Sequence, residues 1–303
     1  MWWPAFGNAG RRTGGVRLLQ VSDPHFGSET PEVVEGLLRL AHELVPDVVL
    51  FSGDITQRAR KAQFAAARRF AAVLLHRPAS EPRASLIAVP GNHDLPLFNL
   101  VARLFWPYAG YRAAFGDKLE TQWQSPALQL TALDTTRRWR HKDGEVSAEQ
   151  IERVALRLRQ ATAQQLRVVV AHHPFAVPRD SEKGNLVHGH ERALRRLAEA
   201  GADLVLGGHI HLPAVIPVHE RLPGLPRRMW VVQAGTAVSS RVRHDAGNSV
   251  NVVRLADADP AEIAVPGQRR CRVERWDWQP ASAAFEPADV HELDCEHPLA
   301  LRR

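Results

Sequence analysis

Short apolar runs alternate with amphipathic stretches through the first two thirds of the chain. Residues 16–22, 47–52 and 85–89 have the length and the continuous apolar character of buried strands. Between the first two, residues 31–45 place apolar side chains at helical spacing, and Pro31 is typical of a first helical turn. This alternation predicts a layered α/β fold.

The same alternation continues to about residue 207 and then changes to shorter β-like runs. A capping-box sequence, S-A-E-Q, begins at Ser147. We expect further helices at 60–76, 147–162 and 190–200, and further strands at 128–133, 166–171 and 203–207. The later β-like runs are 229–234, 248–255, 262–265 and 270–278.

No composition break separates two domains. We therefore predict a flexible leader at 1–14 and one domain at 15–303, with a β-rich C-terminal part that completes a second sheet. Residues 267–303, with Trp276 and Trp278, are expected to form an edge strand and a tail, or alternatively to supply a dimer contact. The pattern does not indicate an oligomeric state.

Composition narrows the class of protein. Apolar residues make up 45% of the chain and charged residues 24%, which excludes disorder, and no apolar run is long enough for a membrane span. The net charge is +6, but the arginines are dispersed, so nucleic-acid binding is possible without being favoured. The two cysteines are expected to be reduced thiols, and the first 15 residues do not resemble a signal peptide, so we expect a cytoplasmic protein.

Five apolar runs end in polar clusters. These are Asp23-Pro24-His25, Gly53-Asp54, Gly91-Asn92-His93-Asp94, His172-His173-Pro174 and Gly207-Gly208-His209-Ile210-His211. Each cluster alone is an ordinary turn sequence. Ligand sites of open α/β sheets lie outside the carboxyl ends of the strands, so all five are expected to meet at one edge of the molecule.

The side chains in these clusters suit divalent metals. Carboxylate, imidazole and amide oxygen bind Mn, Fe, Co, Zn or Ni, and the absence of cysteine argues against a closed structural zinc site. The seven candidate ligands are Asp23, His25, Asp54, Asn92, His172, His209 and His211. Seven ligands are too many for one ion with an open position, and they suit two ions that share a carboxylate.

The ordered blocks D-x-H, G-D, G-N-H-D, H and G-H-x-H resemble those of the calcineurin-like metallophosphoesterases, over residues 16 to about 255. SGDITQRAR and VPGNHDLP are similar to the bacterial cyclic-nucleotide phosphodiesterase-like branch. The resemblance implies an α/β fold: a four-layer αββα sandwich of two mixed β-sheets flanked by helices, with a dinuclear site at one edge.

The resemblance also implies a role for each residue of the site. One metal would be held by Asp23, His25, Asp54 and His211, and the other by Asp54, Asn92, His172 and His209. Asp54 would bridge the two ions, and His173 would lie behind the ligands. His93 would protonate the leaving oxygen, and Asp94 would fix the tautomer and orientation of the His93 imidazole.

The activity implied is hydrolysis of a phosphoric ester by a hydroxide bound between two divalent ions, which would be Mn, Fe, Zn or Co. We expect a phosphodiesterase that acts on a small molecule such as a cyclic nucleotide or a glycerophosphodiester. A phosphomonoesterase, a nuclease and a non-catalytic scaffold remain alternatives. Non-catalytic scaffolds of this fold typically lack some of the metal ligands, whereas all seven are present in this chain. A lipid-precursor pyrophosphatase of the UDP-diacylglucosamine type usually has Arg where this chain has His93.

Substrate choice depends on residues outside these blocks. Residues 95–116 follow the third cluster and would either wall the site or pack as an amphipathic helix pair on the core. Their aromatic residues are Phe98, Phe105, Trp106, Tyr108, Tyr111 and Phe115. Further candidates near the rim are Arg137, Arg138, Arg140, His141, His188 and His190.

Overall fold

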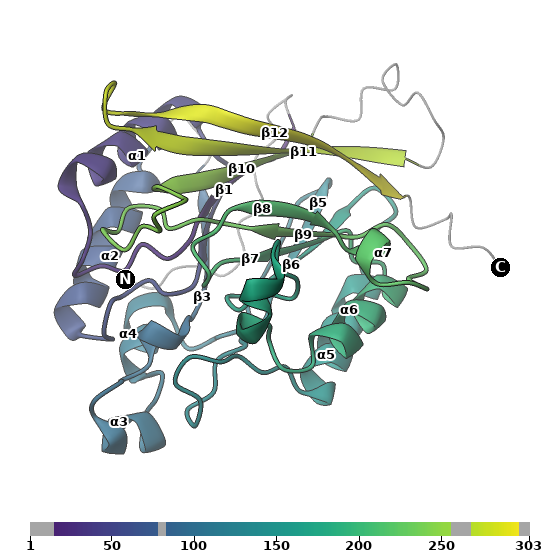
Figure 1. Cartoon of the computed structure of the whole chain (residues 1–303), viewed down its shortest axis with the longest axis horizontal. Coiled ribbons are helices and arrows are strands. Elements are labelled where there is room, and N and C mark those ends of the chain that lie inside the picture. Colours follow the sequence, from purple (N-terminus) through teal and green to yellow (C-terminus); the bar gives the residue numbers. More distant parts are fainter. Residues whose placement is uncertain (1–14, 78–82, 256–267, 297–303) are drawn as a thin grey trace.

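The computed structural model describes residues 15–77, 83–255 and 268–296. Two six-stranded sheets lie face to face, with helices on their outer sides (Figure 1). None of the helices in the described ranges is both long and apolar enough to cross a membrane. The predicted four-layer αββα sandwich is confirmed.

The first sheet has the strand order β12-β11-β10-β1-β2-β3. Its strands are β1 (Arg17–Val21), β2 (Val48–Ser52), β3 (Ser85–Val89), β10 (Ser249–Leu255), β11 (Gln268–Gln279) and β12 (Ala284–Glu296). β1, β2 and β3 run parallel, whereas β10, β11 and β12 pair antiparallel. The sheet is therefore mixed.

The second sheet has the order β4-β5-β6-β7-β9-β8. Its strands are β4 (Gln122–Gln124), β5 (Leu128–Ala132), β6 (Leu166–Val170), β7 (Leu204–Gly207), β8 (Ala214–Pro217) and β9 (Trp230–Gln233). The four central strands are parallel and the two edge strands are antiparallel. The pattern analysis did not predict β4 or β8, which are only three and four residues long.

Helices cover both outer faces. α1 (Pro31–Leu44), α2 (Lys61–Leu74) and α4 (Ala109–Phe115) pack on the first sheet. α5 (Ala148–Arg159), α6 (His190–Glu199) and α7 (Val218–Arg221) pack on the second. α3 (Leu100–Phe105) projects from the body of the molecule (Figure 1). Short 3₁₀ helices occur at η1 (Asn92–Asp94) and η2 (Asp180–Asn185).

Side chains of the central strands alternate between two apolar cores. Leu18 and Leu50 point between the sheets, while Leu19 and Phe51 point toward α1 and α2. Because both faces are buried, these strands appear in the sequence as continuous apolar runs. The buried Gln20 links the sheets near the carboxyl end of β1: its Nε2 donates to the carbonyl oxygen of Gly207, 2.9 Å away.

The C-terminal segment differs from the prediction. We expected an edge strand followed by a tail, but β11 and β12 form a long antiparallel hairpin, with β12 at the edge of the first sheet. Trp278 anchors this hairpin on α1, where a Cβ at Gly36 would lie 2.2 Å from its ring. The predicted strand at 262–265 and the predicted leader at 1–14 lie outside the described residues.

Candidate metal centre

The five polar clusters follow β1, β2, β3, β6 and β7, and the structure brings them together. Nε2 of His172 lies 3.3 Å from Oδ1 of Asp54 and 3.3 Å from Oδ1 of Asn92. Nε2 of His211 lies 3.2 Å from Oδ1 of Asp23. Ligand atoms of Asp23, Asp54 and His172 all lie within 4.8 Å of one another. The expected convergence at one edge is therefore present.

Five of the seven predicted ligands have a strained backbone. Their φ angles are 49° at Asp23, 44° at His25, 47° at Asp54, 72° at His209 and 53° at His211. Eight described non-glycine residues have positive φ, so most of them are predicted ligands. Each such conformation costs about 1–3 kcal/mol and persists where the surroundings enforce it, typically at functional sites.

Two glycines of the clusters allow close approach. A Cβ at Gly91 would lie 2.1 Å from the backbone nitrogen of Asp54 and 2.2 Å from its Oδ1. Gly53 has φ +95°, and a Cβ there would lie 2.3 Å from Nδ1 of His172. Any larger residue would push Asp54 or His172 away from the centre.

Backbone carbonyls set the orientation of two imidazoles. Nδ1 of His172 donates to the carbonyl oxygen of Ser52 at 3.0 Å, and Nδ1 of His211 donates to that of Arg241 at 2.8 Å. A proton held at Nδ1 leaves Nε2 as a lone-pair donor. Both Nε2 atoms point inward, toward the carboxylates.

The carboxylates and imidazoles of the cluster shift one another's pKa values. Burial alone would raise the pKa values of Asp23 and Asp54, but neighbouring histidines, chiefly His211 and His172, hold both below the ordinary range. Burial alone would lower the pKa of His172, but Asp54 raises it to about 9. Burial lowers the pKa of His25 to about 3, so its imidazole is neutral at pH 7.

The buried polar atoms fit a metal better than they fit each other. Nε2 of His25 lies 3.1 Å from Nε2 of His211, and the buried Oδ1 of Asp23 has no hydrogen-bond partner apart from its 3.2 Å contact with this same Nε2 of His211. A buried polar atom without a partner costs free energy, and facing imidazole nitrogens repel unless one carries a proton. Divalent cations among these nitrogens and oxygens would satisfy all of them.

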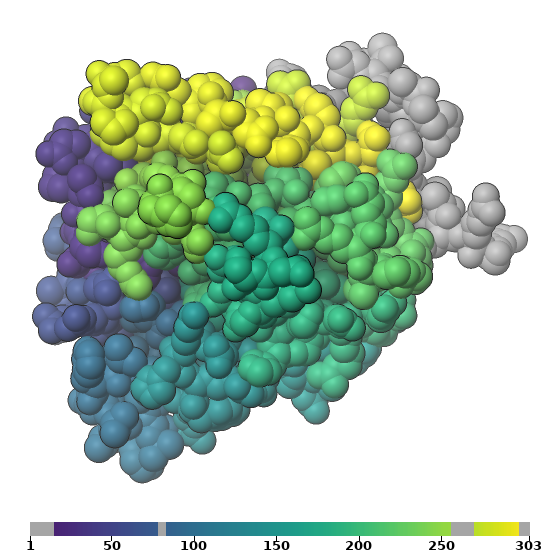
Figure 2. Space-filling view, in the orientation of Figure 1, coloured from purple at the N-terminus to yellow at the C-terminus, as the bar shows by residue number. Residues whose placement is uncertain are grey.

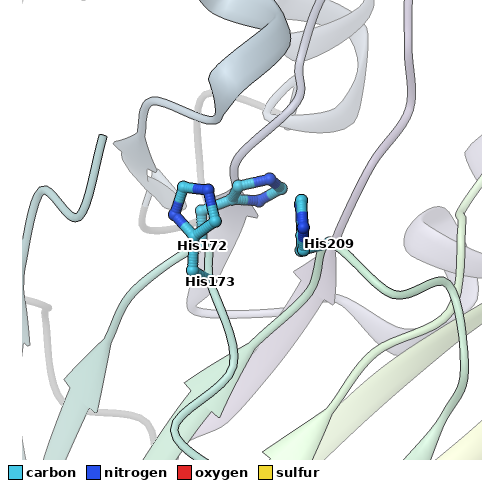
Figure 3. Close-up of side chains that lie close together, drawn as sticks. All are labelled: His172, His173 and His209. Atoms are coloured by element: carbon cyan, nitrogen blue, oxygen red, sulfur yellow. The ribbon is translucent and has the colours of Figure 1, made fainter. Parts of the chain in front are cut away.

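His173 lies beside the predicted ligands His172 and His209, close enough to belong to the same group of possible metal-binding side chains. Figure 3 shows His172 and His173 at the end of β6, with His209 facing them from the loop after β7. The hydroxyl of Thr135 lies 2.8 Å from Nδ1 of His173, and Nε2 lies 2.9 Å from the carbonyl oxygen of Lys142. Because both ring nitrogens have protein partners, His173 is placed to support His172 and His209, whose rings it contacts.

His93 lies at the open side of the cluster. Its side chain is 21% exposed, and its Nε2 lies 4.0 Å from Oδ2 of Asp54. Nδ1 donates to the carbonyl oxygen of Gln57 at 2.8 Å. Nη1 of Arg241 lies 3.1 Å from Nε2 of His93. Neither Gln57 nor Arg241 was predicted to belong to the site. Gln57 contributes only its backbone carbonyl, and Arg241 lies in the loop after β9, whose sequence has no recognisable pattern.

The expected role of Asp94 is wrong. Its carboxylate makes no contact with the His93 imidazole; it accepts hydrogen bonds from the backbone N–H groups of Ile55, Thr56 and Gly91. The hydroxyl of Thr56 donates to it as well, at 2.9 Å. Asp94 therefore ties the loop after β3 to the loop after β2, and the carbonyl of Gln57 holds the imidazole of His93 instead.

The rim residues divide into two groups. Residues 109–115 form α4, in which Tyr111 is buried against the core, as the packing alternative expected. In contrast, Phe98, Phe105 and Trp106 are exposed. Arg140 pairs with Glu145 and contacts His188.

Comparison with known proteins agrees with this geometry. The calcineurin-like phosphoesterase (Metallophos) family profile matches residues 16–213, so the chain belongs to this family. The family hydrolyses phosphoesters with divalent ions in a dinuclear site. No curated protein matches the chain.

Solved structures share the fold at low identity. The purple acid phosphatase PPD1 from yellow lupin (Lupinus luteus) superposes with a TM-score of 0.66 at 12% identity, over 97% of this chain and 56% of that one. A dimetal phosphatase from Danio rerio gives 0.57 at 13%, over 94% and 99%. PhoD gives 0.63 at 10%, over 95% and 71%. This chain thus spans little more than half of the lupin enzyme.

Proposed function

We propose that this chain is a phosphodiesterase that hydrolyses a small-molecule diester, such as a cyclic nucleotide or a glycerophosphodiester. The observation that carries the proposal is the convergence of carboxylates and inward-facing Nε2 atoms around buried polar atoms that lack partners. The blocks SGDITQRAR and VPGNHDLP, which are similar to the cyclic-nucleotide phosphodiesterase-like branch, support the diester class.

Two groups of side chains would hold a pair of divalent ions. The first group is Asp23, His25, Asp54 and His211, and the second is Asp54, Asn92, His172 and His209. When bound, the ions would lower the pKa of a coordinated water and neutralise charge on the phosphoryl oxygens. The donor set is consistent with Mn, Fe, Zn or Co.

The chain's own residues position the ester and move the proton. Asp54 accepts the backbone N–H of His93 at 2.8 Å, which couples the central carboxylate to the residue at the open side. The carbonyl of Gln57 keeps a proton on Nδ1 of His93, so Nε2 is the atom that exchanges a proton with the leaving oxygen. Arg241 adds a permanent positive charge beside Nε2, where an anionic ester would lie.

The test compares bis(p-nitrophenyl) phosphate with p-nitrophenyl phosphate as substrates of metal-stripped protein to which Mn²⁺ is returned. We expect metal-dependent turnover that favours the diester. A preference for the monoester would make the protein a phosphatase. Bound metal with neither substrate turned over would contradict hydrolysis of simple esters, and absence of both metal and turnover would favour a binding scaffold.

A screen of natural esters then narrows the substrate. Cyclic nucleotides and glycerophosphodiesters are compared with single-stranded and duplex DNA under the same metal conditions. We expect turnover of a small diester. Faster turnover of DNA, with steep salt dependence of its binding, would show a nuclease instead.

A further inference from the structure

The exposed large apolar residues of this protein are concentrated at one place. Among the described residues, seven of the eleven belong to α3, its flanks and one neighbouring loop. They are Phe98, Leu100, Val101, Leu104, Phe105, Trp106 and Trp139, and each is 50–73% exposed. We refer to these seven residues as the α3 patch. Such a concentration on a surface normally marks a binding site.

The α3 patch is held together by hydrogen bonds from side chains to backbone carbonyls. Nε of Arg103, a buried residue of α3, donates to the carbonyl oxygen of Arg138 at 2.8 Å. Nη1 of Arg138 in turn donates to the carbonyl oxygen of Leu104 at 2.9 Å. These bonds join the loop that carries Trp139 to α3, so the seven residues belong to one continuous region. α3 itself lies in the lobe at the lower left of Figures 1 and 2, away from the two sheets.

The charged residues around the α3 patch are mostly basic, although the exposed Asp117 and Asp143 lie at its borders in the sequence. Residues 95–116 and 137–142 contain no Asp or Glu. The exposed basic residues there are Arg112, Arg138 and Lys142, and the exposed Arg58 lies with its guanidinium 5.3 Å from the ring of Phe98. Within the described ranges, no carboxylate forms an ion pair with any of these four residues. The apolar side chains of the patch would therefore match an apolar layer, and the basic residues around it would match negative charge at the surface of that layer.

We propose that the α3 patch docks on the surface of a lipid bilayer that contains anionic lipids. Trp and Phe side chains favour the boundary between headgroups and acyl chains, and Leu and Val add buried apolar area. The surrounding arginines and Lys142 meet anionic headgroups. A nucleic acid would use the aromatic rings but offers nothing for Leu100, Val101 and Leu104 to bury against.

The position of the α3 patch relates it to the candidate metal centre. Phe98 is four residues after Asp94, and Arg58 follows Gln57, whose carbonyl oxygen contacts His93. Docking would bring the open side of the centre near the bilayer surface. The binding itself does not depend on the proposed phosphodiesterase activity, so the two can fail separately.

The experiment is co-sedimentation of the full chain with sucrose-loaded vesicles. One set contains phosphatidylglycerol and phosphatidylcholine, and the other phosphatidylcholine alone. We expect stronger binding to the anionic vesicles, weakening as salt rises from 0.05 to 0.5 M, roughly as surface electrostatics are screened. Equal binding to both, or binding to neither at low salt, would overturn the proposal.

Variants then locate the surface. The double change Phe105→Gln and Trp106→Gln should weaken vesicle binding by at least about tenfold, since each ring loses its burial in the interface. Arg112→Gln should weaken it by about fivefold. The matched control, Val73→Gln with Leu156→Gln, changes two equally exposed apolar residues outside the patch and should bind as the wild type does. All five positions are exposed, so thermal unfolding should change little.

If the α3 patch binds something other than a bilayer, the experiments give different results. If analytical ultracentrifugation shows a dimer that the Phe105→Gln and Trp106→Gln variant abolishes, the α3 patch is a contact between copies of this chain and the proposal is wrong. If the same variant binds vesicles as tightly as the wild type, another surface holds the bilayer. Loss of DNA binding in that variant, without vesicle binding by the wild type, would assign the patch to nucleic acid.

Discussion

Nη1 of Arg241 lies 3.1 Å from Nε2 of His93, which places a permanent cation at the atom that would exchange a proton with the leaving group. The contact joins the loop after β9 to the loop after β3. The carbonyl oxygen of the same arginine accepts the Nδ1 proton of His211, so one residue contacts both the open side and the interior of the centre.

The side chain of Arg241 should therefore matter for substrate binding. Arg241→Gln keeps the backbone carbonyl that orients His211 but removes the charge beside the ester. We expect KM for bis(p-nitrophenyl) phosphate to rise by about tenfold, the loss of one charge-assisted contact, with metal content unchanged. Steady-state kinetics check this. Arg69→Gln, the same change on the exposed side of α2, should leave KM as it is; equal KM in both variants would contradict a role for Arg241.

His93 is expected to act on the chemical step alone. His93→Ala should retain both metals, because neither ring nitrogen belongs to the proposed ligand set, and should lose about 10²–10⁴-fold in kcat. Elemental analysis and steady-state kinetics measure the two effects. The control is His244→Ala, which changes a 91% exposed side chain in the loop after β9. A His93→Ala enzyme with wild-type kcat would remove His93 from the mechanism.

Asp94 should act through stability, since it joins two loops. Each of its oxygens accepts two hydrogen bonds, so Asp94→Asn turns an amide NH₂ toward two donors. We expect a loss of about 2–3 kcal/mol in the free energy of unfolding, measured by urea denaturation. Activity and metal content should fall together. Unchanged stability with lost kcat would instead restore a direct role beside His93.

A substitution at Gly91 tests how closely its backbone must approach Asp54. In Gly91→Ala the new Cβ would lie 2.1 Å from the backbone nitrogen of Asp54, so the carboxylate must move. We expect metal affinity to fall by at least about tenfold, comparable to the loss of a supporting contact. Isothermal titration with Mn²⁺ measures it. Gly247→Ala, where no atom lies within 4 Å of the new Cβ, should bind metal as the wild type does.

The sequence predicted the strand ends that hold the centre because those strands are buried on both faces and end abruptly in polar residues. Both ends of α1 and of β3 lie within one residue of the predicted positions. Pro31 marks the start of the helix, and the turn that contains Gly91 follows the strand. Of the two edge strands of the second sheet, β4 was missed because its three residues include one apolar side chain, and β8 because its apolar run is only four residues long.

The contacts around His93 depend on tertiary packing instead. Gln57 acts through a backbone carbonyl, which any residue type would supply, and Arg241 reaches His93 across 148 positions of sequence. Asp94 follows His93 directly, and this adjacency suggested a contact. The 3₁₀ turn at η1 points its carboxylate the other way, toward the N–H groups of Ile55 and Thr56. Sequence proximity was therefore misleading there.

Metal-free protein should lose stability as pH falls from 7 to 5. Burial lowers the pKa values of His25 and His209 to about 3, and burial together with His209 and His172 lowers that of His173 well below its usual value. The unfolded chain protonates these groups below pH 6.5 while the folded chain does not. Each group therefore contributes stability that is present above pH 6.5 and lost as pH falls; for His25 and His209 the loss is about 2 kcal/mol each by pH 5.

His172 and His211 have raised pKa values, so their contribution is present below pH 6.5 and lost as pH rises. Burial also raises the pKa of Asp94 to about 6, and its contribution is lost as pH rises through 6. Together these groups offset part of the fall. Urea denaturation of metal-stripped protein at pH 7 and pH 5 measures the net change. His173→Gln removes one buried imidazole outside the proposed ligand set, so the fall between the two pH values should be smaller in the variant than in the wild type. An identical fall in the variant and the wild type would show that His173 is protonated in the folded protein at pH 5.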